Sequence, residues 1–455
     1  MNRDFFLEEA SRIGNLLLDN RVATKLGNQT WLIPNGYGTE ANPLRISKAG
    51  VHLYDGVAGI ALFLATLGHA SGSPRFESAS LEAILPLRQL LQRIIKNRSS
   101  AELNIPPGGL IGLGSIIYAL LKIGDLLDSP TLASEAHELS ELLTADELSK
   151  DHRVRIQTGA AGALLAILAL QEKIPEPNRN GHTPLEIANK CARRLVGARR
   201  SFEGLPAAWP LSPGKPPLIG FSYGAAGISY ALLRLHKVQP NPEYLAAAED
   251  GLRFVAAFFT PELGCWKDVR QSFEMSHELL SGTWKDWWAN GTSAQLKPRP
   301  NLASAASPSN RDLYSAIWCH GAPGIALGRL GTLDVQDSPE IRQEIEGALR
   351  FTETRIREAE AAGGGPDDLC CGRMGQIDVF LEAGRLLQAP QWQELAEDFA
   401  EAAVLQARER GRYVLSAARG TDVFSPALFQ GLAGVGYTLL RLIDPDNLPC
   451  ILRLS

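Results

Sequence analysis

The chain has 455 residues, of which 45% are apolar and 21% charged, so it can bury a substantial core. Its net charge of −5 argues against nucleic-acid binding, because contacts to phosphate require a surplus of Lys and Arg. No N-terminal segment joins basic residues to a long apolar core, and the longest apolar stretch, 159–170, is too short to cross a bilayer. We therefore expect a cytoplasmic protein without a membrane span.

A short pattern recurs seven times along the chain and predicts buried helices. Each copy consists of a Gly, two residues, a small residue and then an apolar stretch of helical period. These stretches carry few charges, so their helices should be buried on most sides, and the glycines let neighbouring backbones approach closely. The copies start at Gly56, Gly112, Gly159, Gly224, Gly321, Gly372 and Gly431.

Amphipathic segments lie between the copies. They carry apolar residues at helical spacing among charged residues, and strand-like alternation is scarce. A buried helix that alternates with an amphipathic helix seven times predicts an all-α fold, an (α/α) toroid of about seven inner and seven outer helices. An open solenoid of the same two-helix units is the alternative. The clearest amphipathic segments are 81–94, 245–259, 341–349 and 395–402.

The spacing between copies is widest from the fourth to the fifth, which indicates an insertion. We expect a single domain over 1–455, with this insertion at about 260–317. A cover over one face of the toroid and a packed loop without catalytic importance are both consistent with its composition. It contains Trp266, Trp284, Trp287 and Trp288 and ends in the Ser/Pro/Asn-rich stretch 297–310.

Three of the six cysteines occupy matched positions in neighbouring copies. Cys319 and Cys370 lie two residues before the glycine of their copy, and Cys371 lies one residue before it. If the inner helices form a ring, the three thiols meet at one rim. Three sulfur ligands fit one tetrahedral zinc ion per chain with an open fourth position, which is typical of a catalytic site and suits thiol activation. Buried core cysteines without a metal are the alternative.

His320 directly follows the first of these cysteines. Adjacent residues diverge on a helix, which favours a role for His320 as an acid or base beside the metal. A fourth metal ligand, which would close the site, and a purely structural histidine are the other roles open to it.

At these residues the sequence resembles the lanthionine synthetase C-like cyclases. It is most similar to the cyclase half of bifunctional lanthipeptide synthetases of the LanM type, and the resemblance covers essentially the whole chain. The matching stretches are Leu-Tyr-Asp-Gly at 53–56, Gly-Phe-Ser-Tyr-Gly at 220–224, Trp-Cys-His-Gly-Ala-Pro-Gly at 318–324, Cys-Cys-Gly at 370–372 and Gly-Leu-Ala-Gly-Val-Gly-Tyr at 431–437.

This resemblance implies an α/α toroid with one zinc ion held by Cys319, Cys370 and Cys371. The implied substrate is a dehydrated precursor peptide with its leader, whose Cys thiolate adds to dehydroalanine or dehydrobutyrine to form a (methyl)lanthionine ring. Bifunctional members carry a dehydratase domain ahead of the cyclase. We accordingly expect a stand-alone cyclase or an excised cyclase half, with a dehydratase domain or protein as its partner.

The residues that would handle protons depart from the family pattern. Tyr223 stands where a catalytic His is usual, and Arg155 aligns with a usual acidic residue. Some members place Arg where this chain has Ser315. We expect Tyr223, helped by Arg155, to protonate the enolate, and His320 can share the task. Asp55, an acidic residue at the rim positions, is a candidate for substrate binding.

Three other functions stay open. The first is a zinc-stabilised scaffold that binds a peptide but turns over poorly. The second is an enzyme of the same fold that adds glutathione to dehydrated residues. The third is a toroid glycoside hydrolase, which is disfavoured because such an enzyme needs a pair of carboxylates at the sugar.

Overall fold

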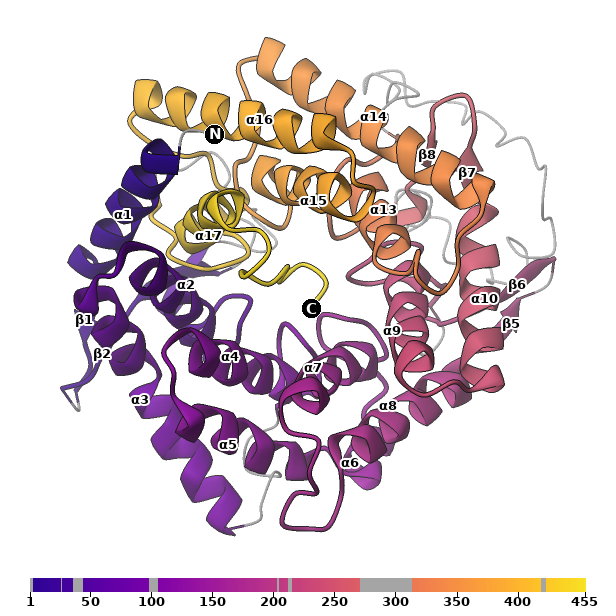
Figure 1. Cartoon of the computed structure of the whole chain (residues 1–455), viewed down its shortest axis with the longest axis horizontal. Helices are drawn as coiled ribbons and strands as arrows, with labels where there is room; N and C mark the ends of the chain where they lie inside the picture. Colours follow the sequence, from indigo (N-terminus) through magenta and orange to yellow (C-terminus); the bar gives the residue numbers. More distant parts are fainter. Residues whose placement is uncertain are drawn as a thin grey trace.

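The computed structural model describes residues 3–25, 27–35, 44–97, 105–202, 204–211, 215–270, 313–418 and 423–455. Within these ranges seven buried helices form an inner ring (Figure 1). Each packs against the next, and α17 packs back against α2, so the predicted toroid is confirmed and the open solenoid is wrong. The inner helices are α2 (Val57–Ser71), α4 (Leu113–Leu126), α7 (Ala160–Lys173), α9 (Ala225–Val238), α13 (Ala322–Leu330), α15 (Arg373–Leu386) and α17 (Leu432–Ile443).

All seven inner helices start directly after a glycine of the repeated pattern. Close contact between backbones explains why the residue three positions after the first glycine of the pattern is small. At Gly162 an added Cβ atom would lie 1.9 Å from the carbonyl oxygen of Ile156, so a larger residue would push the preceding turn away from the helix. The copy at Gly112 differs in its backbone, because Gly112 has a φ of 144°, which side chains disfavour.

The outer ring consists of seven amphipathic helices in the described ranges, and each packs mainly against one inner helix. Six of them begin with proline, which suits the first helical position because its missing N–H has no intrahelical partner there. The N-terminal helix α1 pairs with α17 and completes the seventh pair. The outer helices are α1 (Arg3–Asp19), α3 (Pro74–Asn97), α5 (Pro130–Leu139), α8 (Pro184–Ala198), α10 (Pro242–Ala256), α14 (Pro339–Ala361) and α16 (Pro390–Arg410).

Short elements connect the helices. They include α6 (Ala145–Lys150), two 3₁₀ turns, η1 (Ser140–Leu142) and η3 (Ser416–Ala418), and four two-stranded antiparallel sheets. The strand pairs are β1 (Val22–Ala23) with β2 (Gln29–Thr30), β3 (Leu32–Asn35) with β4 (Arg45–Lys48), β5 (Arg200–Phe202) with β6 (Leu205–Ala208), and β7 (Phe259–Thr260) with β8 (Cys265–Trp266).

The predicted insertion starts in the β7–β8 sheet. Trp266 is buried there, and the two described ends of the insertion are joined, since the Asp268 N–H donates to the Leu313 carbonyl at 2.8 Å. Trp284, Trp287, Trp288 and the stretch 297–310 lie outside the described residues. Whether the insertion covers the toroid or is a packed loop therefore stays a prediction.

Beyond α17 the chain turns inward and ends near the centre of the ring (Figure 1). A buried charge network ties this segment to the inner helices. Arg441 pairs with Asp378 and, at 2.7 Å, with Glu382, which also pairs with Arg453 at 2.6 Å. Burial alone would raise the pKa of Glu382, but Arg453 and Arg441 outweigh it and lower the pKa to about 2. These charges are tolerated inside the ring because each is paired.

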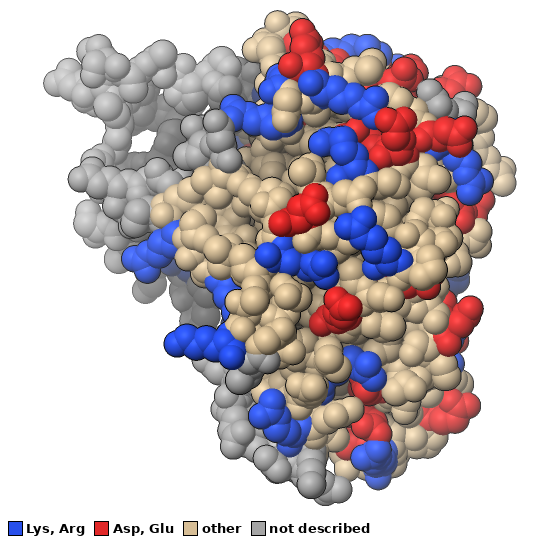
Figure 2. Space-filling model, turned by 90° about the vertical axis from the view of Figure 1, so that its left-hand side faces the viewer, with Lys and Arg blue, Asp and Glu red and all other residues tan. Residues whose placement is uncertain are grey.

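The outer wall carries charges of both signs. On the side of α1 and α3, Lys and Arg side chains alternate with Asp and Glu without a large patch of one sign (Figure 2). No helix in the described ranges is both long enough and apolar enough to cross a membrane.

Candidate metal centre and active site

The seven turns that precede the inner helices lie side by side around one rim of the ring, and main-chain hydrogen bonds join them. Tyr54 in the first turn donates its N–H to the Leu110 carbonyl at 3.0 Å, and Phe429 in the last turn donates to the Tyr54 carbonyl at 3.1 Å. The series therefore runs from the turn of Cys319 through the first turn to the turn of Cys370 and joins six of the seven pairs of neighbouring turns in the described chain. Its other members join Leu110 to Gln157, Gln157 to Ser222, Ser222 to Cys319, and Cys370 to Phe429.

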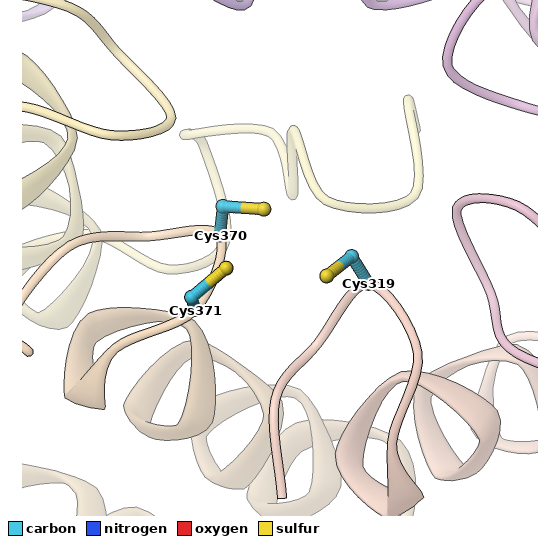
Figure 3. Close-up of side chains that lie close together, drawn as sticks. All are labelled: Cys319, Cys370 and Cys371. Atoms are coloured by element: carbon cyan, nitrogen blue, oxygen red, sulfur yellow. The ribbon is translucent and has the colours of Figure 1, made fainter. Parts of the chain in front are cut away.

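The turns that carry Cys319 and Cys370 are the exception, since no main-chain hydrogen bond between these residues is found in the described part of the chain. At this open junction the Sγ atoms of Cys319, Cys370 and Cys371 lie within 4.8 Å of one another and point toward a common space (Figure 3). A side chain spans the junction instead, because Gln376 Nε2 donates to the Ala316 carbonyl at 2.7 Å.

The thiol cluster can hold a metal ion. Zinc–sulfur bonds of about 2.3 Å in a tetrahedral arrangement place sulfurs about 3.8 Å apart, so small shifts adapt the cluster to zinc. Cys319, Cys371 and burial raise the pKa of Cys370 well above its usual value, so a cation is needed to hold all three groups as thiolates. Three sulfurs leave the fourth position of a tetrahedral ion open.

Two aspartates hold the turn that carries Cys371. Asp368 accepts the Cys371 N–H at 2.9 Å and the Ser416 N–H at 2.7 Å. Burial and the nearby Cys371 raise the pKa of Asp368 to about 6. Asp367 is paired with Arg373 at 2.5 Å and is also buried. These contacts fix the turn, as expected for a site whose ligands must keep their directions.

Three predicted catalytic residues form a stack beside the thiols. The rings of His320 and Tyr223 are 4.7 Å apart and inclined by 16°, and the Arg155 guanidinium lies 5.2 Å from the centre of the Tyr223 ring. The ligand cluster found among the described residues does not include His320. The stacked geometry therefore favours a role beside the metal over the role of fourth ligand.

Arg155 was expected to lower the pKa of Tyr223, but the pKa of Tyr223 is raised. Burial, together with Cys370 and Cys319, raises the pKa of Tyr223, and the lowering effect of Arg155 is too small to reverse it. The sequence shows the arginine but not the burial that outweighs it. Burial and the charges of Arg270 and Arg155 lower the pKa of His320 to about 3, so its imidazole is neutral near pH 7.

Comparison with known proteins places these residues in a family. The family model described as "Lanthionine synthetase C-like protein" matches residues 47–453. The chain belongs to the lanthionine synthetase C-like family. Among solved structures, its fold is similar to that of nisin cyclase, with a TM-score of 0.57 and 18% identity over 89% of this chain and 92% of that one.

Two further structures are more distantly similar to this lanthionine synthetase C-like chain. Unsaturated glucuronyl hydrolase from Bacillus sp. GL1 gives a TM-score of 0.40 at 14% identity over 78% of this chain and 84% of that one. A GH76 α-mannanase from Bacteroides thetaiotaomicron gives 0.45 at 10% identity over 98% and 96%. Similarity at this level carries no argument about the function of this chain.

Arg270 is a site residue of this lanthionine synthetase C-like chain that sequence reasoning missed. Its guanidinium is clamped on the buried Asp268, with Nη2 2.6 Å from Oδ2 and Nε 3.1 Å from Oδ1. Burial alone would lower the pKa of Arg270, but Asp268 and the nearby Cys319 and Cys371 raise it. The same Asp-x-Arg clamp recurs at Asp151 and Arg153, and this repeated pattern is the sequence signal that could have revealed it.

Asp55 lies on the same rim of this family member, two turns from Cys371 and separated from it by the turn of Gln430. Its Oδ1 is buried and has no hydrogen-bond partner in the described structure. Burial raises the pKa of Asp55, and the neighbouring His52 opposes that shift. His52 Nδ1 in turn accepts the Gly112 N–H at 3.1 Å. The expected contact of Asp55 with substrate stays a prediction.

Proposed function

We propose that this chain is a zinc-dependent lanthionine cyclase that acts on a dehydrated precursor peptide. In the proposed reaction, the thiol of a peptide Cys adds to the β-carbon of a dehydroalanine or dehydrobutyrine in the same peptide and forms a (methyl)lanthionine ring. The observation that carries the proposal is the trio of clustered thiols at the open junction of the rim, in a chain of the lanthionine synthetase C-like family.

Cys319, Cys370 and Cys371 would hold one zinc ion per chain. When bound, zinc supplies a Lewis acid at its open position that lowers the pKa of a substrate thiol. The chain contributes the charge of the site, because three thiolates exceed the charge of a divalent cation. An electron-rich site lets an incoming thiolate keep its nucleophilicity, which suits addition to a carbon–carbon double bond.

The proton of the substrate thiol passes to solvent, and one proton must reach the α-carbon from a donor that solvent then reprotonates. The sulfur electron pair forms the new C–S bond, and the π electrons of the double bond move onto the adjoining amide as an enolate. Tyr223 is the proposed proton donor to the α-carbon, because its buried phenol is protonated at neutral pH. His320 lies flat against the Tyr223 ring and would keep the phenol in place or share the transfer.

Two guanidinium groups border the reacting region. Negative charge develops on the enolate oxygen during addition, and a fixed cation nearby stabilises that transition state. Arg270, clamped by Asp268, is proposed to supply part of this charge because its own pKa is raised by two of the thiols. Arg155, over the face of Tyr223, is the second such cation.

The deciding experiment measures zinc content and thiol loss in the same preparation. The purified chain is loaded with zinc, washed, analysed for metal and incubated with a dehydrated precursor peptide. Ring closure leaves the peptide mass unchanged but consumes a thiol, so alkylation of free thiols followed by mass spectrometry counts the rings. We expect one zinc ion per chain and progressive loss of alkylatable thiol.

Two cysteine variants supply the controls. Cys319→Ala should lose both zinc and ring formation. Cys191→Ala should keep both, because it removes a buried thiol of α8 that does not belong to the cluster. Peptide–glutathione adducts in the presence of glutathione would favour the glutathione-adding alternative. Zinc binding without any thiol loss would leave a peptide-binding scaffold.

A further inference from the structure

Tyr54 contacts the thiol cluster from the opposite end of the sequence. It occupies the first turn of the rim, at the position that Cys319 and Cys370 occupy in theirs. Its hydroxyl is hydrogen-bonded to Cys370 Sγ at 3.1 Å, across a sequence separation of 316 residues. None of the roles assigned above uses this hydroxyl.

The Tyr54 ring is held so that its hydroxyl has little freedom. The side chain is buried, and the ring stacks on Phe429 with centroids 4.8 Å apart and planes inclined by 12°. Phe429 belongs to the turn between those of Cys370 and Tyr54, so the phenol reaches along this turn to the sulfur. Main-chain bonds from Tyr54 to Leu110 and from Phe429 to Tyr54 fix the position of the backbone.

The direction of this hydrogen bond follows from the chemistry of the donors. A thiolate that binds a metal has no proton, so the Tyr54 O–H must donate and the sulfur must accept. Hydrogen bonds to a charged acceptor are stronger than those between neutral groups.

From the hydrogen bond and the stacking we infer that Tyr54 is a positioning residue of the metal centre, which fixes the direction of the Cys370 thiolate and withdraws part of its charge. The inference rests on the metal site of the proposed function. Hydrogen-bonding partners of metal ligands typically change metal affinity 10- to 100-fold when they are removed.

The test compares two conservative variants of the full chain. Tyr54→Phe removes the hydroxyl but keeps the stacking ring and the main-chain bonds. Tyr118→Phe is the matched control, because Tyr118, in α4, is also buried and its hydroxyl also donates a hydrogen bond, at 3.1 Å to the Ser455 carbonyl. Zinc affinity is measured by competition with a chelator, and the Co²⁺-substituted protein gives the sulfur-to-metal charge-transfer absorption.

We expect Tyr54→Phe to weaken zinc binding about tenfold. Its Co²⁺ charge-transfer band should move to lower energy, because a thiolate without the hydrogen bond gives up its electrons more readily. Tyr118→Phe should match the parent in both measurements. Parent-like affinity and an unchanged spectrum in Tyr54→Phe would overturn the inference.

The experiment also separates this inference from the proposed function. A parent chain that binds neither Zn²⁺ nor Co²⁺ would overturn both. A parent that binds metal with the expected Tyr54 dependence but forms no thioether rings would refute the cyclase activity alone and would support the role of Tyr54.

Discussion

The junctions of the rim are of two kinds. Within the described ranges, six pairs of neighbouring turns share a main-chain hydrogen bond, whereas the turns of Cys319 and Cys370 share none. The closed junctions are stable without a ligand because their backbones satisfy one another. The open junction instead collects three thiols that disfavour one another's ionisation. The same repeat thus serves as scaffold where the backbones pair and as a ligand site where they separate.

The largest expected effect comes from a substitution that breaks a closed junction. In Gly162→Ala, the new Cβ atom would lie 1.9 Å from the Ile156 carbonyl oxygen and 2.3 Å from the Gly109 nitrogen. Since main-chain atoms must move, we expect the free energy of unfolding to fall by about 4 kcal/mol or more, measured by chemical denaturation. Gly197→Ala, where no atom lies within 4 Å, should change stability by at most about 1 kcal/mol. Equal stabilities of the two variants would contradict the role of close backbone contact.

Removal of zinc should affect the open junction alone. A ligand at about 1,000 times its Kd stabilises the folded state by about 4 kcal/mol, so chelation should lower the melting temperature by several degrees. Hydrogen exchange measured by mass spectrometry should accelerate in 316–321 and 371–372 and stay unchanged at the N–H groups of the closed junctions, including that of Cys370. Cys371→Ala should reproduce the exchange pattern of the metal-free parent. Faster hydrogen exchange around the whole rim would show that the open and closed junctions do not differ in their dependence on zinc.

Tyr223→Phe tests the proton transfer proposed beside the open junction. The variant keeps the ring that stacks on His320, so zinc content should stay at the parent level. Loss of a general acid typically costs at least 100-fold, and we expect kcat to fall by about that factor. Products formed in D₂O should also show mixed configuration at the α-carbon, because solvent then delivers the proton from both sides. Parent-like kcat and configuration would assign the proton to another group.

Arg270→Gln should have the smallest effect of the series. One fixed charge near the enolate is worth about 1–2 kcal/mol at an effective dielectric constant near 20, so kcat/KM should fall about tenfold with zinc retained. Arg153→Gln is the matched control, because Arg153 makes the same clamp on Asp151 but its pKa is not affected by the thiols. Equal losses in both variants would show that the clamp, and not the charge beside the sulfurs, matters.

The ring and the thiol cluster could be predicted from the sequence because both depend on residues that recur at matching positions of the repeat. Gly162 and its counterparts recur since a side chain there would collide with a carbonyl oxygen, so the repeat could be aligned without a structure. When the copies of the repeat are aligned, Cys319, Cys370 and Cys371 occupy matching positions just before the glycines of neighbouring copies. The seven-fold alternation then predicted a toroid, and the contact of α17 with α2 excluded the open solenoid that the same alternation allowed.

Residues whose positions depend on contacts outside the repeat were not predicted. Arg270 lies within the insertion at about 260–317, and its place follows from Asp268 and the pairing of Asp268 with Leu313. The hydroxyl of Tyr54 meets Cys370 only because the ring closes. The raised pKa of Tyr223 reflects burial, which depends on how neighbouring turns pack and leaves no local pattern.

Ring closure also sets an order of events during synthesis. Cys370 receives a hydrogen bond from Tyr54 in the first turn and donates one to Phe429 in the last. Contacts between segments so distant in sequence form late, because the entropy of a long loop must be overcome first. We therefore expect a nascent chain to contain all three cysteines well before it can arrange them. Metal uptake with native affinity would then mark the moment at which α17 reaches α2 and the ring is complete.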